Sequence, residues 1–185
     1  MRLVRRLGLL ALVLAAVAPR PVAADGSWID GNRTSWNQAG MAIPAALAAT
    51  EPFGPCGEFV RPPETPEDAQ LAAAGWRLDA GYESGWGIRV VHAAQSFDAN
   101  CRPMDYQGFV FVDGVFAGTI SPQPMLSRTD GSAVDVYLAQ ADHITVVYTR
   151  YGPNDPLCCP ARTDYVNFAM QRAADGPVAV PQPAN

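Results

Sequence analysis

The chain has 185 residues, with 13 basic and 18 acidic side chains and a formal net charge of −5, and it contains no lysine. An acidic protein repels the phosphates of nucleic acids and of anionic membranes, so neither is expected as a partner. The length suffices for one domain with its own hydrophobic core.

The first 24 residues have the pattern of a secretory signal peptide. Three arginines among the first six residues precede an apolar run at 7–18, which is too short to span a membrane. Small residues at 22–24 place the cleavage between Ala24 and Asp25. Cleavage takes away four of the 13 arginines and leaves a mature charge of −9. We therefore expect a secreted or periplasmic protein, with an uncleaved N-terminal anchor as the alternative.

No lipid anchor and no further membrane span are expected. The first cysteine is Cys56, far from the cleavage site, and no later hydrophobic stretch is long enough to cross a bilayer.

Residues 25–63 are expected to form an irregular arm, because proline and glycine recur and no hydrophobic period holds. Trp28 and Trp36 lie in this arm, and we expect them to dock onto the surface of the domain.

One helix has signals at both ends. Thr65 is a good N-cap, Pro66 suits the first helical position, Asp68 favours the positive end of the helix dipole, and Gly75 stops the helix. The apolar face is mostly alanine with Leu71, which predicts a packing element that lies against a sheet.

From Trp76 onward the pattern is that of β-strands. Asp113-Gly114 between two apolar runs indicates a tight hairpin, since both residues must tolerate a positive φ. The expected strands lie at 76–79, 86–94, 107–112, 115–120, 134–138, 144–151 and 165–170. Their short connections leave no room for parallel crossovers.

These elements predict an α+β fold with an antiparallel sheet of six or seven short strands and one short helix, stapled by disulfides. The expected domain covers residues 64–172. The tail at 173–185 is rich in proline and alanine and is expected to be disordered.

Four cysteines follow the leader, which indicates a disulfide framework in an exported chain. They are Cys56, Cys101, Cys158 and Cys159. Joining the two adjacent cysteines would make a strained eight-membered ring, so we expect each of them to pair with one of the two distant cysteines, in an order left open. A metal site or a redox pair is the alternative, but the spacing does not fit zinc and there is no C-x-x-C.

No catalytic motif is present, and neither a cofactor nor a metal is expected. The two histidines, His92 and His143, are the only candidates for a histidine base. The densest polar cluster spans 127–131, and its side chains make a candidate binding site together with a later arginine: Ser127, Arg128, Asp130 and Arg150. A turn satisfied by its own side chains is the alternative for this cluster.

A second group of charges surrounds the cysteine pair in the sequence. Arg150, Asp155 and Arg162 could form ion pairs that order this loop, or a binding site.

Three stretches together resemble the LppP/LprE lipoprotein family. They are FVFVDGVFAGT at 109–119, Arg150-Tyr151, and DPLCCP at 155–160. The resemblance covers roughly residues 56–170, and the paired cysteines are its more specific part. It implies an envelope-associated bacterial protein and supplies no catalytic residues. Because this chain lacks the lipidated cysteine, it resembles a soluble relative of that family.

Three functions compete. The leading hypothesis is a non-catalytic module of the envelope or the secreted fraction that binds a protein or a small ligand. The second is an envelope hydrolase that uses carboxylates, or a histidine with Asp130 or Asp142. The third is a secreted inhibitor-like factor, which requires the loop at 152–160 to be exposed and protruding.

Overall fold

The computed structural model describes residues 27–31, 33–47, 54–127, 130–156 and 158–183. The expected signal peptide lies outside these residues. Within them, no helix is both long and apolar enough to cross a membrane.

The described residues form one α-helix, one 3₁₀ helix and ten strands, more strands than the six or seven expected. The helices are η1 (Gly54–Phe59) and α1 (Pro66–Ala73). The strands are β1 (Arg77–Gly85), β2 (Ile88–Ala94), β3 (Ser96–Phe97), β4 (Pro103–Met104), β5 (Gln107–Val112), β6 (Val115–Thr119), β7 (Ser132–Gln140), β8 (His143–Arg150), β9 (Arg162–Ala173) and β10 (Gly176–Pro181).

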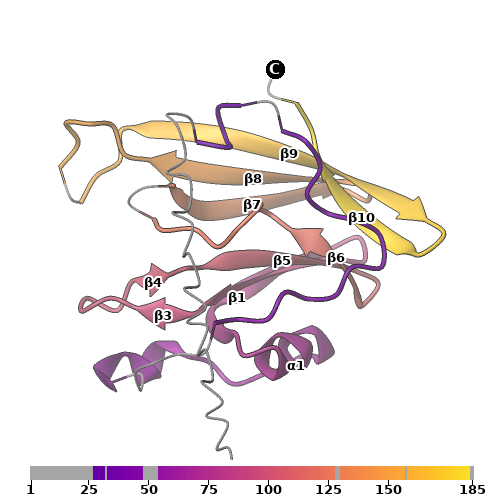
Figure 1. Cartoon of the computed structure of the whole chain (residues 1–185), viewed down its shortest axis with the longest axis horizontal. Coiled ribbons are helices and arrows are strands. Elements are labelled where there is room, and N and C mark those ends of the chain that lie inside the picture. The colour runs from indigo at the N-terminus through magenta and orange to yellow at the C-terminus, as the bar shows by residue number, and fades with distance from the viewer. Residues whose placement is uncertain (1–26, 32, 48–53, 128–129, 157, 184–185) are drawn as a thin grey trace, which may run out of the picture.

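The strands form two four-stranded antiparallel sheets and one small hairpin, where one sheet was expected. The order is β1-β2-β5-β6 in the first sheet and β10-β9-β8-β7 in the second, while β3 pairs only with β4. The two large sheets lie in successive layers, with α1 beneath the first sheet (Figure 1). Their edges approach each other on both sides, β6 beside β10 and β1 beside β7.

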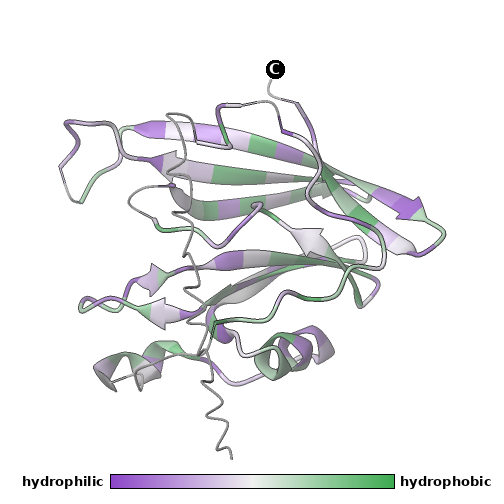
Figure 2. Cartoon of the chain, in the orientation of Figure 1, coloured by the Kyte–Doolittle hydropathy of each residue, from purple (hydrophilic) through white to green (hydrophobic). Residues whose placement is uncertain are grey.

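Alternation of side chains along the strands explains the two layers of core. Hydrophobic and hydrophilic bands follow one another along the strands of the second sheet (Figure 2). Val90 and Val110 of the first sheet and Val146 and Phe168 of the second meet in one buried cluster between the sheets. A second cluster lies between the first sheet and α1, where Leu71 is fully buried.

The structure confirms the helix that the sequence signals predict. The Thr65 side chain accepts a hydrogen bond from the Asp68 backbone, the Asp68 carboxylate caps the Thr65 backbone in return, and Pro66 is the first helical residue. Gly75 follows the helix with φ +90°, as a helix stop requires.

The Asp113-Gly114 hairpin is also confirmed, with φ values of +50° and +80°. A second hairpin of the same kind was not predicted from the sequence. Trp86 and Gly87 join β1 to β2 with φ values of +58° and +77°. A tryptophan in the left-handed region is unusual. Its indole Nε1 donates to the Leu138 carbonyl at 3.0 Å, which ties this turn to the second sheet.

The arm is irregular, as expected, but it is part of the core rather than an appendage. Trp28 and Trp36 stack edge to face with ring centroids 5.2 Å apart, and both pack against the cluster between the sheets. Asn37 is buried where the edges of β6 and β10 meet. The core therefore includes residues of the arm, and the domain boundary at residue 64 stays a prediction.

The prediction of a disordered tail at 173–185 is wrong for most of that segment. Residues 176–181 form β10, which pairs with β9 from Gly176↔Ala173 to Pro181↔Phe168. Val178 and Ala179 are buried. The prolines suggested a frayed end, but Pro177 and Pro181 stand at the two ends of an apolar edge strand, where proline is tolerated, and Pro183 follows the strand.

The crossed disulfide pairing is wrong. Cys56 of η1 pairs with Cys101 of the β3–β4 turn, with Cα atoms 5.2 Å apart, and Cys158 pairs with its neighbour Cys159. The tertiary arrangement gives the reason: the β8–β9 loop with the adjacent cysteines leaves the second sheet, while η1 lies on the far side of the first sheet (Figure 1).

Candidate functional site

Two adjoining cavities lie beside the β3–β4 hairpin, and together they are called the end cavity here. The outer cavity has about 370 Å³, and its lining includes Arg102, Met104, Leu126, Ser127, Ser132 and Tyr151. The inner cavity has about 260 Å³ and is lined in part by Asp79, His92 and Tyr106. Pro103, Ser127 and Ser132 line both.

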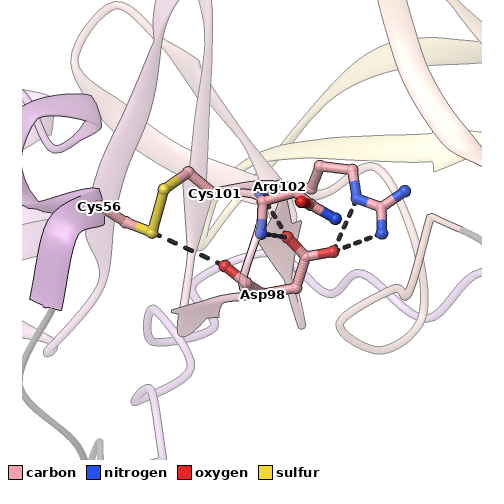
Figure 3. Close-up of a disulfide and its surroundings, with 5 residues drawn as sticks. Cys56, Asp98, Cys101 and Arg102 are labelled. Carbon is pink, nitrogen blue, oxygen red and sulfur yellow. Dashed lines mark hydrogen bonds and ion pairs between the residues drawn. A yellow bond between two sulfur atoms is a disulfide. The ribbon is translucent and has the colours of Figure 1, made fainter.

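The turn between β3 and β4 forms one wall of the outer cavity. The Asp98 carboxylate accepts from the backbone N–H groups of Asn100 and Arg102 at 2.8 and 2.9 Å, and from the Arg102 guanidinium at 2.7 Å. These donors hold the pKa of Asp98 below its usual range. The Cys56–Cys101 disulfide anchors the same turn to η1 (Figure 3). This wall is therefore a cross-linked loop in a fixed conformation.

Tyr106 fixes the opposite wall. Its hydroxyl donates to the Gly131 carbonyl at 2.6 Å and accepts from the Ala133 backbone at 2.9 Å. Burial raises the pKa of this phenol, so it stays protonated. These two bonds position the start of β7, and with it the Ser132 side chain that lines both cavities.

His92 lines the inner cavity from β2. Its neighbours two residues away, Val90 and Ala94, belong to the cluster between the sheets, so the imidazole lies on that same face. Burial lowers the pKa of His92 to about 4, and the imidazole is neutral at physiological pH. Among the described residues, no side chain is hydrogen-bonded to the ring.

His143 is placed differently. Its Nδ1 lies 2.8 Å from Asp142 Oδ1, on an exposed turn between β7 and β8. The side chains are 49% and 67% exposed, and this pair lines neither part of the end cavity. His143 and Asp142 thus form a solvent-exposed hydrogen bond at the surface.

The structure separates the four candidate binding residues. Ser127 lines both parts of the end cavity. Asp130 accepts from the Leu126 backbone N–H at 2.9 Å, which is the bonding of a self-satisfied turn. Arg128 lies outside the described residues. Arg150 points to a different cluster, on β8 and β9.

That cluster is an ion-pair network between the arm and the second sheet. Arg150 bonds Asp30 at 2.8 Å and Asp164 at 3.2 Å, and Arg162 bonds the same two carboxylates. The hydrogen bond from Arg150 is the main reason why the pKa of Asp30 falls to about 2. The network confirms that Arg150 and Arg162 form ion pairs, but their partner is not Asp155.

Asp155 instead organises the cysteine loop from within. Its carboxylate accepts from the backbone N–H groups of Gly152 and Ala161 at 2.7 and 2.8 Å, which lowers its pKa. Cys158 and Cys159 are exposed, and the loop projects beyond the ends of β8 and β9 (Figure 1). Tyr151, at the base of this loop, lines the outer cavity.

Sequence reasoning did not identify most residues of the end cavity. Met104, Leu126 and Tyr106 come from short or irregular segments with no motif. Tyr151 lies in one of the stretches that resemble the family and carries no other sequence signal. No local signal could bring these residues together, because the cavity exists only where the β3–β4 hairpin meets the connection between β6 and β7.

Comparisons with known proteins give one match. The family model described as LppP/LprE lipoprotein matches residues 81–172, about half of the chain. No curated protein and no solved structure matches the chain. The match includes the strands β2 to β8, most of β1 and β9, and the cysteine loop. The lack of a lipid anchor stays a prediction. The segment from residue 81 to residue 172 therefore resembles the LppP/LprE lipoprotein family.

Proposed function

We propose that this protein is a non-catalytic binding module of the bacterial cell envelope, and that its end cavity takes a small, largely apolar ligand. The observation that supports the proposal is the outer cavity. Its walls are mainly apolar, with Met104 and Leu126 among them, and a few polar groups converge there, including Ser127 and Ser132. Ligand sites in proteins combine an apolar concave surface with a small number of fixed polar groups.

Both walls of the end cavity are held in a fixed conformation. One is the turn cross-linked by Cys56–Cys101, and the other is held by the two hydrogen bonds of Tyr106. A site whose groups are already in place loses less conformational entropy when it binds. Envelope location is suggested by the family match and the expected leader.

A cavity-filling substitution tests the site. Binding of the apolar fluorescent probe N-phenyl-1-naphthylamine is measured by titration to wild type and to Met104→Trp. We expect the variant to bind at least tenfold more weakly, because the indole occupies the outer cavity. The matched control is Val134→Trp, an exposed position on β7 that does not line the cavity. Unchanged binding in Met104→Trp, or an equal loss in the control, would contradict the proposal.

One observation favours a hydrolase as the second candidate. The imidazole of His92, the carboxylate of Asp79 and the hydroxyls of Ser127 and Ser132 all line the inner cavity. These are the group types that nucleophilic hydrolysis needs. Hydrolysis of p-nitrophenyl butyrate by wild type, abolished in His92→Gln and retained in His143→Gln, would favour this function over the binding module.

The exposed cysteine loop meets the condition set for the inhibitor-like hypothesis. Among the described residues of the loop, the Asp155 carboxylate already bonds the backbone N–H groups of Gly152 and Ala161, so that hypothesis ranks third.

A further inference from the structure

A polar cavity separate from the end cavity lies at the edge of the second sheet, and it is called the edge cavity here. It has about 400 Å³ and is lined by residues of the arm, of β9 and of the C-terminal segment, including Asp30, Arg33, Arg162, Thr163, Tyr165 and Asn167. None of its lining residues lines the end cavity. Whatever the edge cavity binds, it does so independently of the proposed function.

The edge cavity lies along a stretch of β9 that, among the described residues, has no neighbouring strand on the side away from β8. Gln182 N donates to the Asn167 carbonyl at 2.8 Å, which shows that the backbone groups of Asn167 point away from β8. Backbone groups of alternate residues point the same way, so those of Thr163 and Tyr165 point along this edge too. The strand β10 ends at Pro181, opposite Phe168, and no described residue bonds these backbone groups.

Side chains on the outer face of β9 add further hydrogen-bonding capacity. The hydroxyls of Thr163 and Tyr165 have no hydrogen-bond partner among the described residues. The side-chain Oδ1 of Asn167 accepts from Thr145 Oγ1 at 2.7 Å, which leaves the side-chain N–H₂ group without a described partner. Tyr165 is 59% exposed, so its aromatic ring is accessible to solvent beside these polar groups.

The charged lining of the cavity consists of two guanidinium groups, Arg33 and Arg162, and two carboxylates, Asp30 and Asp164. Arg150, which is not part of the lining, bonds both carboxylates, so the whole cluster has one cation more than it has anions. Of these three arginines, Arg33 is the one that forms no ion pair with a described residue. It donates to the carbonyls of Ile29 and Gln182 at 2.9 and 3.2 Å, and its Nε is enclosed without a partner.

We propose that the edge cavity binds an acidic sugar, a pyranose-sized ring that carries a carboxylate. The Tyr165 ring offers a flat apolar surface to the C–H face of the sugar. The backbone and side-chain groups of Thr163, Tyr165 and Asn167 bond its hydroxyls. The positive charge of the Arg33 guanidinium compensates the negative charge of the sugar carboxylate.

A protein strand added to this edge is the less favourable occupant. The unpaired edge contains the outward-pointing groups of only Thr163 and Tyr165, because β9 begins at Arg162. Strands in proteins usually pair over more residues than that. A compact ligand with many hydroxyls can use the same groups within about 400 Å³.

Isothermal titration of the full mature protein with glucuronate tests the proposal, with glucose and the methyl ester of glucuronate as neutral counterparts. We expect glucuronate to bind at least tenfold more tightly than either neutral sugar. Equal binding of the ester would remove the role of the carboxylate, and no binding of glucuronate would overturn the proposal. Binding of inorganic phosphate with no binding of glucuronate would also overturn it, since it would show an anion site without sugar recognition.

Two exposed tyrosines of the same sheet provide the matched variants. Tyr165→Ala is expected to weaken glucuronate binding at least tenfold, whereas Tyr137→Ala on β7, 52% exposed and outside the edge cavity, is expected to leave it within twofold. An equal loss in both variants would contradict the assignment of the site. Probe binding to Met104→Trp reports separately on the end cavity, so failure of one proposal does not imply failure of the other.

Discussion

Asn37 and Thr119 form a two-way pair between the arm and β6. The Asn37 amide Nδ2 donates to the Thr119 carbonyl at 2.9 Å, and its Oδ1 accepts from the Thr119 backbone N–H at 2.9 Å. The same Nδ2 donates to the Ala179 carbonyl of β10 at 2.7 Å. One buried side chain thus satisfies the backbones of two sheet edges, as a strand would. Gly118 leaves room for it, since a Cβ there would lie 2.2 Å from the Asn37 side chain.

Asn37→Ala is expected to destabilise the protein by about 2–4 kcal/mol, because it leaves the Thr119 backbone N–H and the Ala179 carbonyl without their bonds to Asn37. The Thr119 carbonyl still accepts from Trp36 Nε1 at 3.1 Å. Urea unfolding followed by tryptophan fluorescence measures the change. Asn154→Ala, in the exposed cysteine loop, is the control and should be neutral. A loss below about 0.5 kcal/mol for Asn37→Ala would show that the arm is not required for joining the two sheet edges.

The two disulfides are expected to contribute unequally to stability. Cys56 and Cys101 are 45 residues apart, and closing such a loop is worth about 4 kcal/mol in the chain-entropy model. Cys158 and Cys159 are adjacent and close no loop of this kind. The double variant Cys56→Ala/Cys101→Ala should therefore unfold at much lower urea than Cys158→Ser/Cys159→Ser.

The order of reduction gives a second measurement on the same bonds. Cys158 and Cys159 are exposed, whereas Cys56 is buried at 4% exposure. Exposed disulfides are attacked first by thiols. Alkylation and mass mapping during a dithiothreitol titration should label the adjacent pair first, and peptides that join Cys158 or Cys159 to Cys56 or Cys101 would refute the observed pairing.

His92 predicts a loss of stability in mild acid. Its pKa is about 4 in the folded protein and about 6.5 in the unfolded chain, so the unfolded state binds the proton first as the pH falls. Stability should decline from about pH 6.5 and level off near pH 4, by at most about 3 kcal/mol. His92→Gln should flatten this decline, and His143→Gln should not. Asp79 and Tyr106 are the other titratable groups that line the same cavity.

Asp68 predicts a separate loss at lower pH. Its side chain is fully buried, and burial by itself raises the pKa of Asp68. The Arg61 guanidinium, at 2.7 and 2.8 Å, and the backbone N–H groups of Glu64 and Thr65 lower this pKa by more, so the net pKa lies below its usual value. Its stabilising contribution is complete above the unfolded value near 4 and is lost as the pH falls below it.

Asp68→Ala is expected to cost about 3–5 kcal/mol at neutral pH, because the substitution removes a buried carboxylate that bonds the Arg61 guanidinium twice and caps the start of α1. The matched control is Glu64→Ala, an exposed acid four residues away. Thermal unfolding of both variants at pH 7 provides the comparison. Similar stabilities for the two variants would contradict a structural role for the Asp68 carboxylate.

The sequence by itself determined the features that depend on neighbouring residues. Thr65, Pro66 and Gly75 set the ends of α1, and Asp113-Gly114 set a hairpin, because caps and tight turns are satisfied within a few residues. Alternation located the long strands for the same reason. The paired cysteines, with the run at 109–119, were enough to indicate the family.

Only the tertiary structure decided which distant segments meet. It divided the strands into two sheets, paired Cys56 with Cys101, and made β10 from an apparently frayed tail. It also placed His92 against the end cavity and left part of the β9 edge open beside Arg33. These outcomes depend on the packing of two sheet faces and their edges, which is a sum of many weak long-range contacts that no short motif encodes.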